Sequence, residues 1–190
     1  MASWYRDGEH GVKQSFVMAA MLFEKAVAHG NPDAMIALAY LHRDGQGVVQ
    51  SDEKAVELFT MAVEQGHVGA MVNLGNMFRD GQGVVQSFKK GVELFTMAAE
   101  KGYAEAMINL GFLYINGQGV DQSNELAREW WTKAANEGDE RAINNLKRLD
   151  KQEGKSSTTT APTPAKTSPP PPVCCSSCNT PQPSTRKFQR

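Results

Sequence analysis

The sequence predicts an all-α fold: a right-handed α-solenoid (α/α superhelix) of about four 36-residue helix-loop-helix repeats, with a disordered C-terminal tail. A fixed period of this length, with apolar residues at helical spacing inside each period, is typical of stacked-repeat proteins. After residue 150 the composition changes to Ser, Thr, Pro and Lys, which cannot bury a core. The residues that recur every 36 positions are Ser15, Ser51, Ser87 and Ser123; Gly30, Gly66, Gly102 and Gly138; Ala34, Ala70, Ala106 and Ala142; and Leu38, Leu74, Leu110 and Leu146.

Residues 1–30 are predicted to form a partial first repeat within a solenoid that covers residues 1–150. Trp4 to Gly8 reads as the last turn of a first-type helix (helix A) whose beginning is absent. The apolar stretch Phe16–Phe23 opens a second-type helix (helix B). It is followed at once by charged residues and no small-residue cleavage site, so it does not read as a secretory signal.

Residues 105–141 show one complete repeat. Helix A is predicted from Glu105 to Ile115, and Gly117 ends it, because glycine accepts the left-handed conformation of a helix C-cap. A loop with one apolar anchor, Val120, leads to Ser123, a predicted N-cap for helix B. Helix B runs to about residue 136, and Gly138 closes the cycle.

Small and large residues alternate where these helices must approach each other. Alanines recur in both helices, and one bulky aromatic residue of helix B fills the space between them. A helix of about 12 residues cannot bury its apolar face alone, and stacking on neighbouring repeats solves this problem. The helix B alanines are Ala26, Ala62, Ala98 and Ala134, and the bulky residues are Phe23, Phe59, Phe95 and Trp131.

The segment 139–150 is predicted to be a polar cap helix. It aligns with helix A, but Lys147 stands where Gly75 and Gly111 stand, and Arg148 and Asp150 follow it. Solenoids need such a polar terminal element for solubility. In total, eight full helices are expected in residues 15–150, with a fragment before them.

The pattern A-x-x-x-L-G-x-x-Y-x-x-G-x-G-V, which stands here as Ala106–Val120, resembles the Sel-1-like repeat, a relative of the tetratricopeptide repeat. Helix B ends in Lys133–Gly138, which also fits the pattern. The resemblance covers about residues 4–150 and implies a scaffold or adaptor that assembles protein complexes. Some secreted bacterial members carry a disulfide in each hairpin, and this chain lacks those cysteines.

In tetratricopeptide-like solenoids the A helices line the concave face, which implies a place for a partner. One row of helix A residues points away from the core-facing alanine and leucine. Either this row is an apolar stripe for a ligand, or it contacts the helices of the next repeat. The row consists of Ile36 and Tyr40, Val72 and Asn76, and Ile108 and Phe112.

Asn73, Asn109 and Asn145 recur beside that row. Such an amide ladder can hydrogen-bond the backbone of an extended peptide, since each side chain offers both donors and an acceptor. Alternatively, the amides hold neighbouring loops. Arg43 and Arg79 suit the helix dipole at the C-termini of their A helices, and a carboxylate-binding role for them is a further option.

No catalytic constellation is visible, so we do not expect an enzyme. The Gly-Gln-Gly loops do not follow a strand and lack the third glycine and the Gly-Lys-Ser/Thr of a phosphate-binding loop. The four histidines are scattered, and no Ser or Cys has a recognisable base. No cofactor is expected for the solenoid.

The charge is unevenly distributed. Residues 151–190 contain six Lys or Arg against one Glu, a net charge of +5, which leaves −6 for residues 1–150 of a chain with a total of −1. An acidic body argues against nucleic-acid binding. With no apolar run long enough for a membrane span, we expect an intracellular protein, in the cytoplasm rather than the nucleus.

The tail is predicted to contain a disordered linker, 151–173, and a half zinc knuckle or disordered end, 174–190. Cys175 and Cys178 have the spacing of one zinc knuckle and resemble the opening of a MYND-type zinc finger. A structural zinc needs four ligands, so the site closes only if Cys174, a second chain or further residues contribute. Zinc is therefore possible only with a completed site. A reactive dithiol is another option.

The main prediction is a non-enzymatic interaction scaffold that binds a protein or peptide segment on its concave helix A face. The contact residues it proposes are Ile36, Tyr40, Asn73, Asn76, Ile108, Asn109 and Phe112. One alternative is a truncated MYND-type adaptor whose solenoid is a positioning arm. A remote alternative is an enzyme that binds a small molecule. The sequence predicts neither the identity of the partner nor the oligomeric state.

Overall fold

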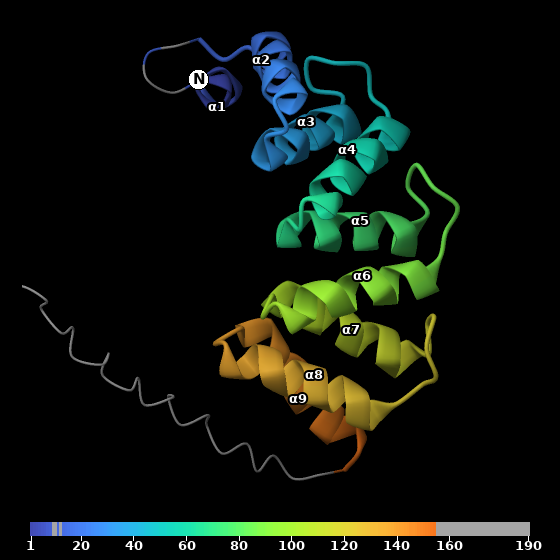
Figure 1. Cartoon of the computed structure of the whole chain (residues 1–190). Helices are drawn as coiled ribbons and strands as arrows, with labels where there is room; N and C mark the ends of the chain where they lie inside the picture. The colour runs from blue at the N-terminus through green and yellow to red at the C-terminus, as the bar shows by residue number, and fades with distance from the viewer. Residues whose placement is uncertain (9–10, 12, 155–190) are drawn as a thin grey trace, which may run out of the picture. The chain divides into compact units, whose positions relative to one another are not determined.

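The computed structural model describes residues 1–8, 11 and 13–154, and this part of the chain is all-α, as predicted. All described residues belong to one compact unit, Met1–Thr159. Figure 1 shows its helices following one another in a stack. They are α1 (Ala2–Asp7), α2 (Phe16–Ala28), α3 (Pro32–Asp44), α4 (Asp52–Glu64), α5 (Val68–Asp80), α6 (Phe88–Glu100), α7 (Ala104–Asn116), α8 (Asn124–Asn136) and α9 (Glu140–Gln152).

The predicted alternation of helix types is present. Helices α3, α5, α7 and α9 occupy the helix A positions and α2, α4, α6 and α8 the helix B positions. Each main contact joins two helices that are neighbours in sequence, so every helix packs mainly on the one before and the one after it. The loops that leave α3, α5 and α7 lie along one edge of the stack (Figure 1).

Each helix B begins at a capping serine, as expected. In α8, the Ser123 hydroxyl accepts a hydrogen bond from the backbone N–H of Leu126 at 3.2 Å, which satisfies one of the free donors of the first turn. The three preceding B helices are capped in the same way by Ser15, Ser51 and Ser87. The C-caps Gly45, Gly81 and Gly117 of α3, α5 and α7 adopt the left-handed conformation.

The glycine loop docks on the helix B of the preceding repeat. Gly83 has a φ of +66°, and a Cβ at this position would lie 2.4 Å from the carbonyl carbon of Asp52 at the start of α4. The side chain of Gln86 closes the same loop by donating a 2.8 Å hydrogen bond to the carbonyl of Arg79. These recurring loop residues therefore serve the stacking of repeats rather than phosphate binding.

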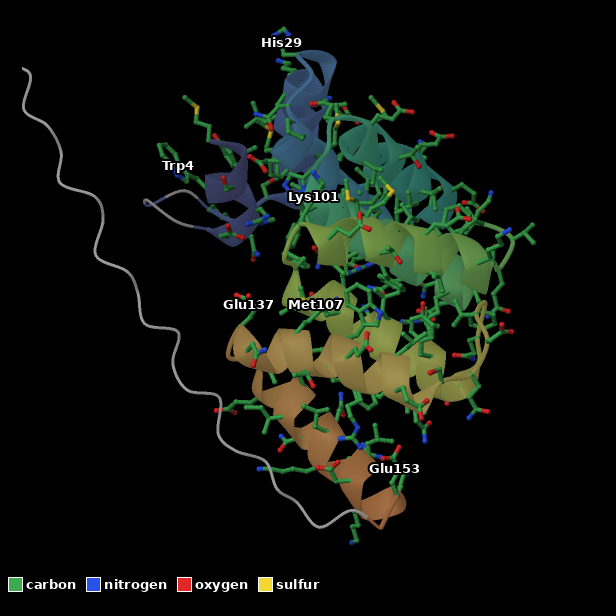
Figure 2. All side chains as sticks on the ribbon, turned by 60° about the horizontal axis from the view of Figure 1, so that its bottom comes forward. Trp4, His29, Lys101, Met107, Glu137 and Glu153 are labelled. Atoms are coloured by element: carbon green, nitrogen blue, oxygen red, sulfur yellow. The ribbon has the colours of Figure 1, made fainter. Side chains whose placement is uncertain are left out.

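The core follows the predicted pairing of small and large residues. Phe59 and Phe95 are completely buried, and Trp131 lies in the equivalent place in α8. A Cβ on Gly111 would meet the Trp131 indole nitrogen at 2.1 Å, so this helix A glycine gives the ring its space. Side chains fill the space between successive helices in Figure 2.

The C-terminal helix differs from the prediction in two ways. It extends to Gln152, so the predicted linker begins too early by at least two residues. Asp150, expected on a polar surface, is 8% exposed and pairs with Arg128 of α8, which also binds Glu153 at 2.7 Å. These contacts hold the last turn of α9 on α8, and Figure 2 labels Glu153 at that end. Lys147 and Arg148 are exposed, as a polar cap requires.

Within the described residues, none of the helices has both the length and the apolar composition needed to cross a bilayer.

Candidate functional site

The predicted row on the A helices is only partly accessible. Tyr40 and Asn76 are half-buried, and Phe112 is 41% exposed. Phe112 contacts the Trp131 ring edge to face, with ring centroids 5.3 Å apart. The first row residue of each A helix is less accessible than the second. Ile36 is half-buried, whereas Val72 and Ile108 are buried.

Ile108 is a correction to the predicted contact surface. Its side chain is 5% exposed and belongs to the core cluster that includes Phe95 and Trp131. Its carbonyl accepts a 3.1 Å hydrogen bond from the Trp131 indole N–H. Because helices α6 to α8 enclose this position, Ile108 packs between repeats and cannot contact a partner.

The first hollow lies across three successive A helices and has a volume of about 200 Å³. Tyr40 and Tyr103 contribute aromatic surface, and Glu105 contributes a carboxylate. The remaining lining residues are Ile36, His67, Gly69, Val72 and Asn73. The hollow thus brings apolar and aromatic side chains together with polar groups from three repeats.

His67 shapes this hollow by capping α5. Its Nδ1 accepts a hydrogen bond from the backbone N–H of Ala70 at 3.3 Å. Its Nε2 lies 3.4 Å from the Asp33 carboxylate. The ring is fixed between two repeats, and its capping role shares the geometry of an asparagine cap such as Asn31 in α3.

The recurring asparagines connect consecutive A helices rather than loops. The Tyr40 hydroxyl donates a 2.9 Å hydrogen bond to Asn73 Oδ1, and the Asn73 amide donates to the carbonyl of Gly69. Arg79 likewise donates to Asn109 Oδ1 at 3.4 Å. The two predicted roles of these amides, binding a peptide backbone or holding neighbouring loops, therefore need revision. The oxygens of Asn73 and Asn109 already have partners inside the solenoid.

Arg43 and Arg79 are neutralised by their neighbours. Arg43 pairs with Asp44 at 2.8 Å, and Arg79 pairs with Asp80 at 2.7 Å. The hydrogen bond from Arg79 holds the pKa of the Asp80 carboxyl below its usual value. A partner's carboxylate would have to displace these aspartates, which weakens the option of carboxylate binding at either arginine.

The second hollow lies at the C-terminal ends of α7 and α9 and has a volume of about 350 Å³. Phe112 and Ile115 form apolar surface, while Asn145 and Arg148 bring polar groups. The other lining residues are Asn116, Trp131, Leu149 and Gln152. The sequence prediction missed Arg148 as a site residue, although the 36-residue register places it in the row of Tyr40, Asn76 and Phe112.

In the described part of the chain, no group of three or more His, Cys, Asp or Glu residues could hold a metal ion. Cys175 and Cys178 lie outside the described residues, as do the rest of the linker after residue 154 and the predicted half zinc knuckle. The zinc site stays a prediction.

The repeats match a known family along most of the solenoid. The Sel1 repeat model matches four times, at residues 1–31, 32–67, 68–103 and 104–139. The chain therefore belongs to the Sel1 repeat family, and the predicted α-solenoid of about four repeats is confirmed. Sel1 repeat proteins are generally non-enzymatic scaffolds that bind other proteins. The matches end before the cysteines, so they lend no support to the MYND-type resemblance.

Solved structures show the same fold. A protective antigen of uropathogenic Escherichia coli, c5321, is 29% identical with a TM-score of 0.77, and the match covers 82% of this chain and 33% of that protein. A Sel1 repeat protein from Oxalobacter formigenes is 27% identical with a TM-score of 0.73, covering 77% and 60%. The cysteine rich protein B of Helicobacter pylori, at 20% identity and a TM-score of 0.55, shares the fold alone.

The chain spans a third of the length of the Escherichia coli protein and 60% of the Oxalobacter protein. No curated protein matches the chain.

Proposed function

We propose that this solenoid is a non-enzymatic scaffold that binds an extended segment of a partner protein along its A helices. The observation that carries the proposal is the position of the two hollows. The first is formed by residues of α3, α5 and α7 and the adjoining caps, and the second largely by α7 and α9. An extended segment can contact several repeats at once, which is how solenoids use their surfaces.

The accessible aromatic residues are the main candidates for contact. Tyr103 in the first hollow and Phe112 in the second are each about 40% exposed. Aromatic side chains bury a large area at little entropic cost and often carry much of the binding energy of an interface. Ile36, Tyr40, Asn73, Asn76 and Asn109 contribute to the same face, with the amides of Asn73 and Asn109 supporting it from inside.

The test is affinity capture with the full chain as bait, comparing wild type with the double variant Tyr103→Ser and Phe112→Ser. Captured proteins are then confirmed by titration with the purified partner. We expect the double variant to lose at least tenfold in affinity, because two apolar anchors are removed.

The matched control is Met61→Ser with Met97→Ser. These methionines are 40% and 45% exposed, but they lie on the B helices α4 and α6. Equal losses for both double variants, or binding unchanged in the first, would rule out the helix A face as the binding surface.

The MYND-type adaptor is a separate hypothesis that depends on Cys175 and Cys178. Metal analysis of the purified full chain tests it directly. Tight zinc in a fixed ratio to protein, lost in Cys175→Ser, supports an adaptor with a completed zinc site. Zinc that washes out during purification contradicts that hypothesis and leaves the scaffold proposal intact.

A further inference from the structure

The hydrogen bonds between consecutive A helices stop at the last repeat. Asn73 is bonded by Tyr40, and Asn109 is bonded by Arg79, each from the preceding A helix. The residues that stand 36 positions after Asn109 and Arg79 are Asn145 and Ile115, and Phe112 stands 72 positions after Tyr40. Neither Phe nor Ile can donate a side-chain hydrogen bond. Asn145 therefore lacks both the tyrosine donor that Asn73 has and the arginine donor that Asn109 has.

Asn145 is consequently buried but unpartnered. It is 9% exposed, and its side chain makes no hydrogen bond to another described residue. It lines the second hollow together with Phe112 and Ile115, the two residues that replaced its donors. An amide without a protein partner offers both donors and an acceptor to a molecule that enters the hollow.

A cation lies in the same hollow. Six arginines fall within the described residues, and five of them have a carboxylate within 4 Å: Arg6, Arg43, Arg79, Arg128 and Arg141. Arg148 has none among these residues, and it is exposed. It stands three residues after Asn145, so both side chains project from the same face of α9.

We propose that the second hollow binds a peptide segment in which an apolar side chain is followed or preceded by a carboxylate. The apolar side chain lies against Phe112 and Ile115, the Asn145 amide pairs with the peptide backbone, and Arg148 binds the carboxylate. The guanidinium fork matches a carboxylate in geometry, and the amide offers the donor and acceptor that a backbone needs. The inference rests on the proposed scaffold function and specifies the chemistry of the segment bound.

The test uses a displayed library of random linear peptides, sorted with the full chain as purified. We expect enriched sequences to share an apolar residue next to Asp, Glu or a free C-terminus. Their synthetic counterparts should lose about tenfold in affinity with Arg148→Gln, since one charge-assisted hydrogen-bonded pair is removed. In Arg148→Glu, sorting should instead enrich Lys or Arg at the same position.

Lys147→Gln is the matched control. It removes the same charge from the adjacent residue, which is exposed but does not line the hollow. Similar losses for Lys147→Gln and Arg148→Gln would overturn the proposal in favour of a general charge effect. Circular dichroism and a thermal melt confirm that each variant is folded before binding is measured.

Other outcomes separate this inference from the scaffold proposal. Enriched peptides that lose affinity with Tyr103→Ser but not with Arg148→Gln would overturn the role of the second hollow and leave the helix A face in place. Peptides that are insensitive to both changes would contradict both. A library without any enriched sequence would overturn the second hollow as a peptide site, while partner capture still tests the scaffold.

Discussion

Glycine in helix A is explained by the ring that faces it. The pairs that occupy this position in successive repeats are Ala39 with Phe59, Gly75 with Phe95, and Gly111 with Trp131. A Cβ would lie 2.8 Å from the Phe95 ring and 2.1 Å from the Trp131 indole, so the tightest glycine faces the largest ring. The indole also donates to the Ile108 carbonyl, which restrains it from moving away.

Gly111→Ala should therefore destabilise the solenoid. We expect a loss of about 1–3 kcal/mol in the free energy of unfolding, because an added methyl in a packed core forces the ring aside. The double variant Gly111→Ala with Trp131→Phe copies the Ala39–Phe59 pair of an earlier repeat. Its loss in the free energy of unfolding should therefore be smaller than the sum of the losses of the two single variants. Urea unfolding followed by circular dichroism measures all three variants, and strict additivity would contradict the steric explanation.

At the scale of the element, α9 is held by charge as well as by apolar packing. Arg128 on α8 binds both Asp150 and Glu153, and Asn124 donates to the second oxygen of Glu153 at 3.2 Å. The Asp150 and Glu153 side chains are mostly covered, so their charges depend on this arginine. A terminal helix packs on one neighbour only, which makes such contacts important for its order.

Arg128→Ala should loosen α9 specifically. Removing the arginine leaves two largely covered carboxylates without their cation, and we expect a loss of about 1–3 kcal/mol. Relative to wild type, hydrogen exchange should accelerate more in α9 than in α3. Arg141→Ala is the control, since its pair with Asp139 is exposed on the arginine side and should contribute less than about 1 kcal/mol. Equal effects of the two changes would show that the Arg128 pair does not anchor the helix.

At the scale of the whole solenoid unit, stability is distributed along the stack. The buried residues form two clusters, one that includes Phe23 and Phe59 and another that includes Phe95 and Trp131. Helix α5 contributes to both, with Leu74 in the first and Met71 in the second. Because each helix contacts mainly its sequence neighbours, a local defect should weaken with distance along the chain.

Phe59→Leu and Phe95→Leu test this distribution. Both rings are fully buried, so each change creates a small cavity of comparable cost, about 1 kcal/mol. Hydrogen exchange should accelerate most in α3 to α5 for the first variant and in α5 to α7 for the second. If either change accelerated exchange equally in all helices, the described solenoid would instead unfold as one cooperative unit.

Much of the fold could be predicted because its determinants are local. The determinants that act within a few residues are helical spacing, capping serines such as Ser123 and closing glycines such as Gly117. Repetition every 36 residues showed which positions are equivalent in successive repeats. The alternation of helices and the pairing of alanines with aromatic rings followed from that period. The helix A face was also predictable, because side chains three and four positions apart share a face.

Only the tertiary structure decided which residues of that face are available. Ile108 lies in a core cluster with Phe95 of α6 and Trp131 of α8, and the hydrogen bonds of Asn73 and Asn109 come from residues about 30 positions earlier. The extension of α9 likewise depends on Arg128 of another helix. The sequence by itself determined the repeat and the fold, since those depend on neighbours along the chain; burial, pairing and the free groups Asn145 and Arg148 depend on neighbours in space.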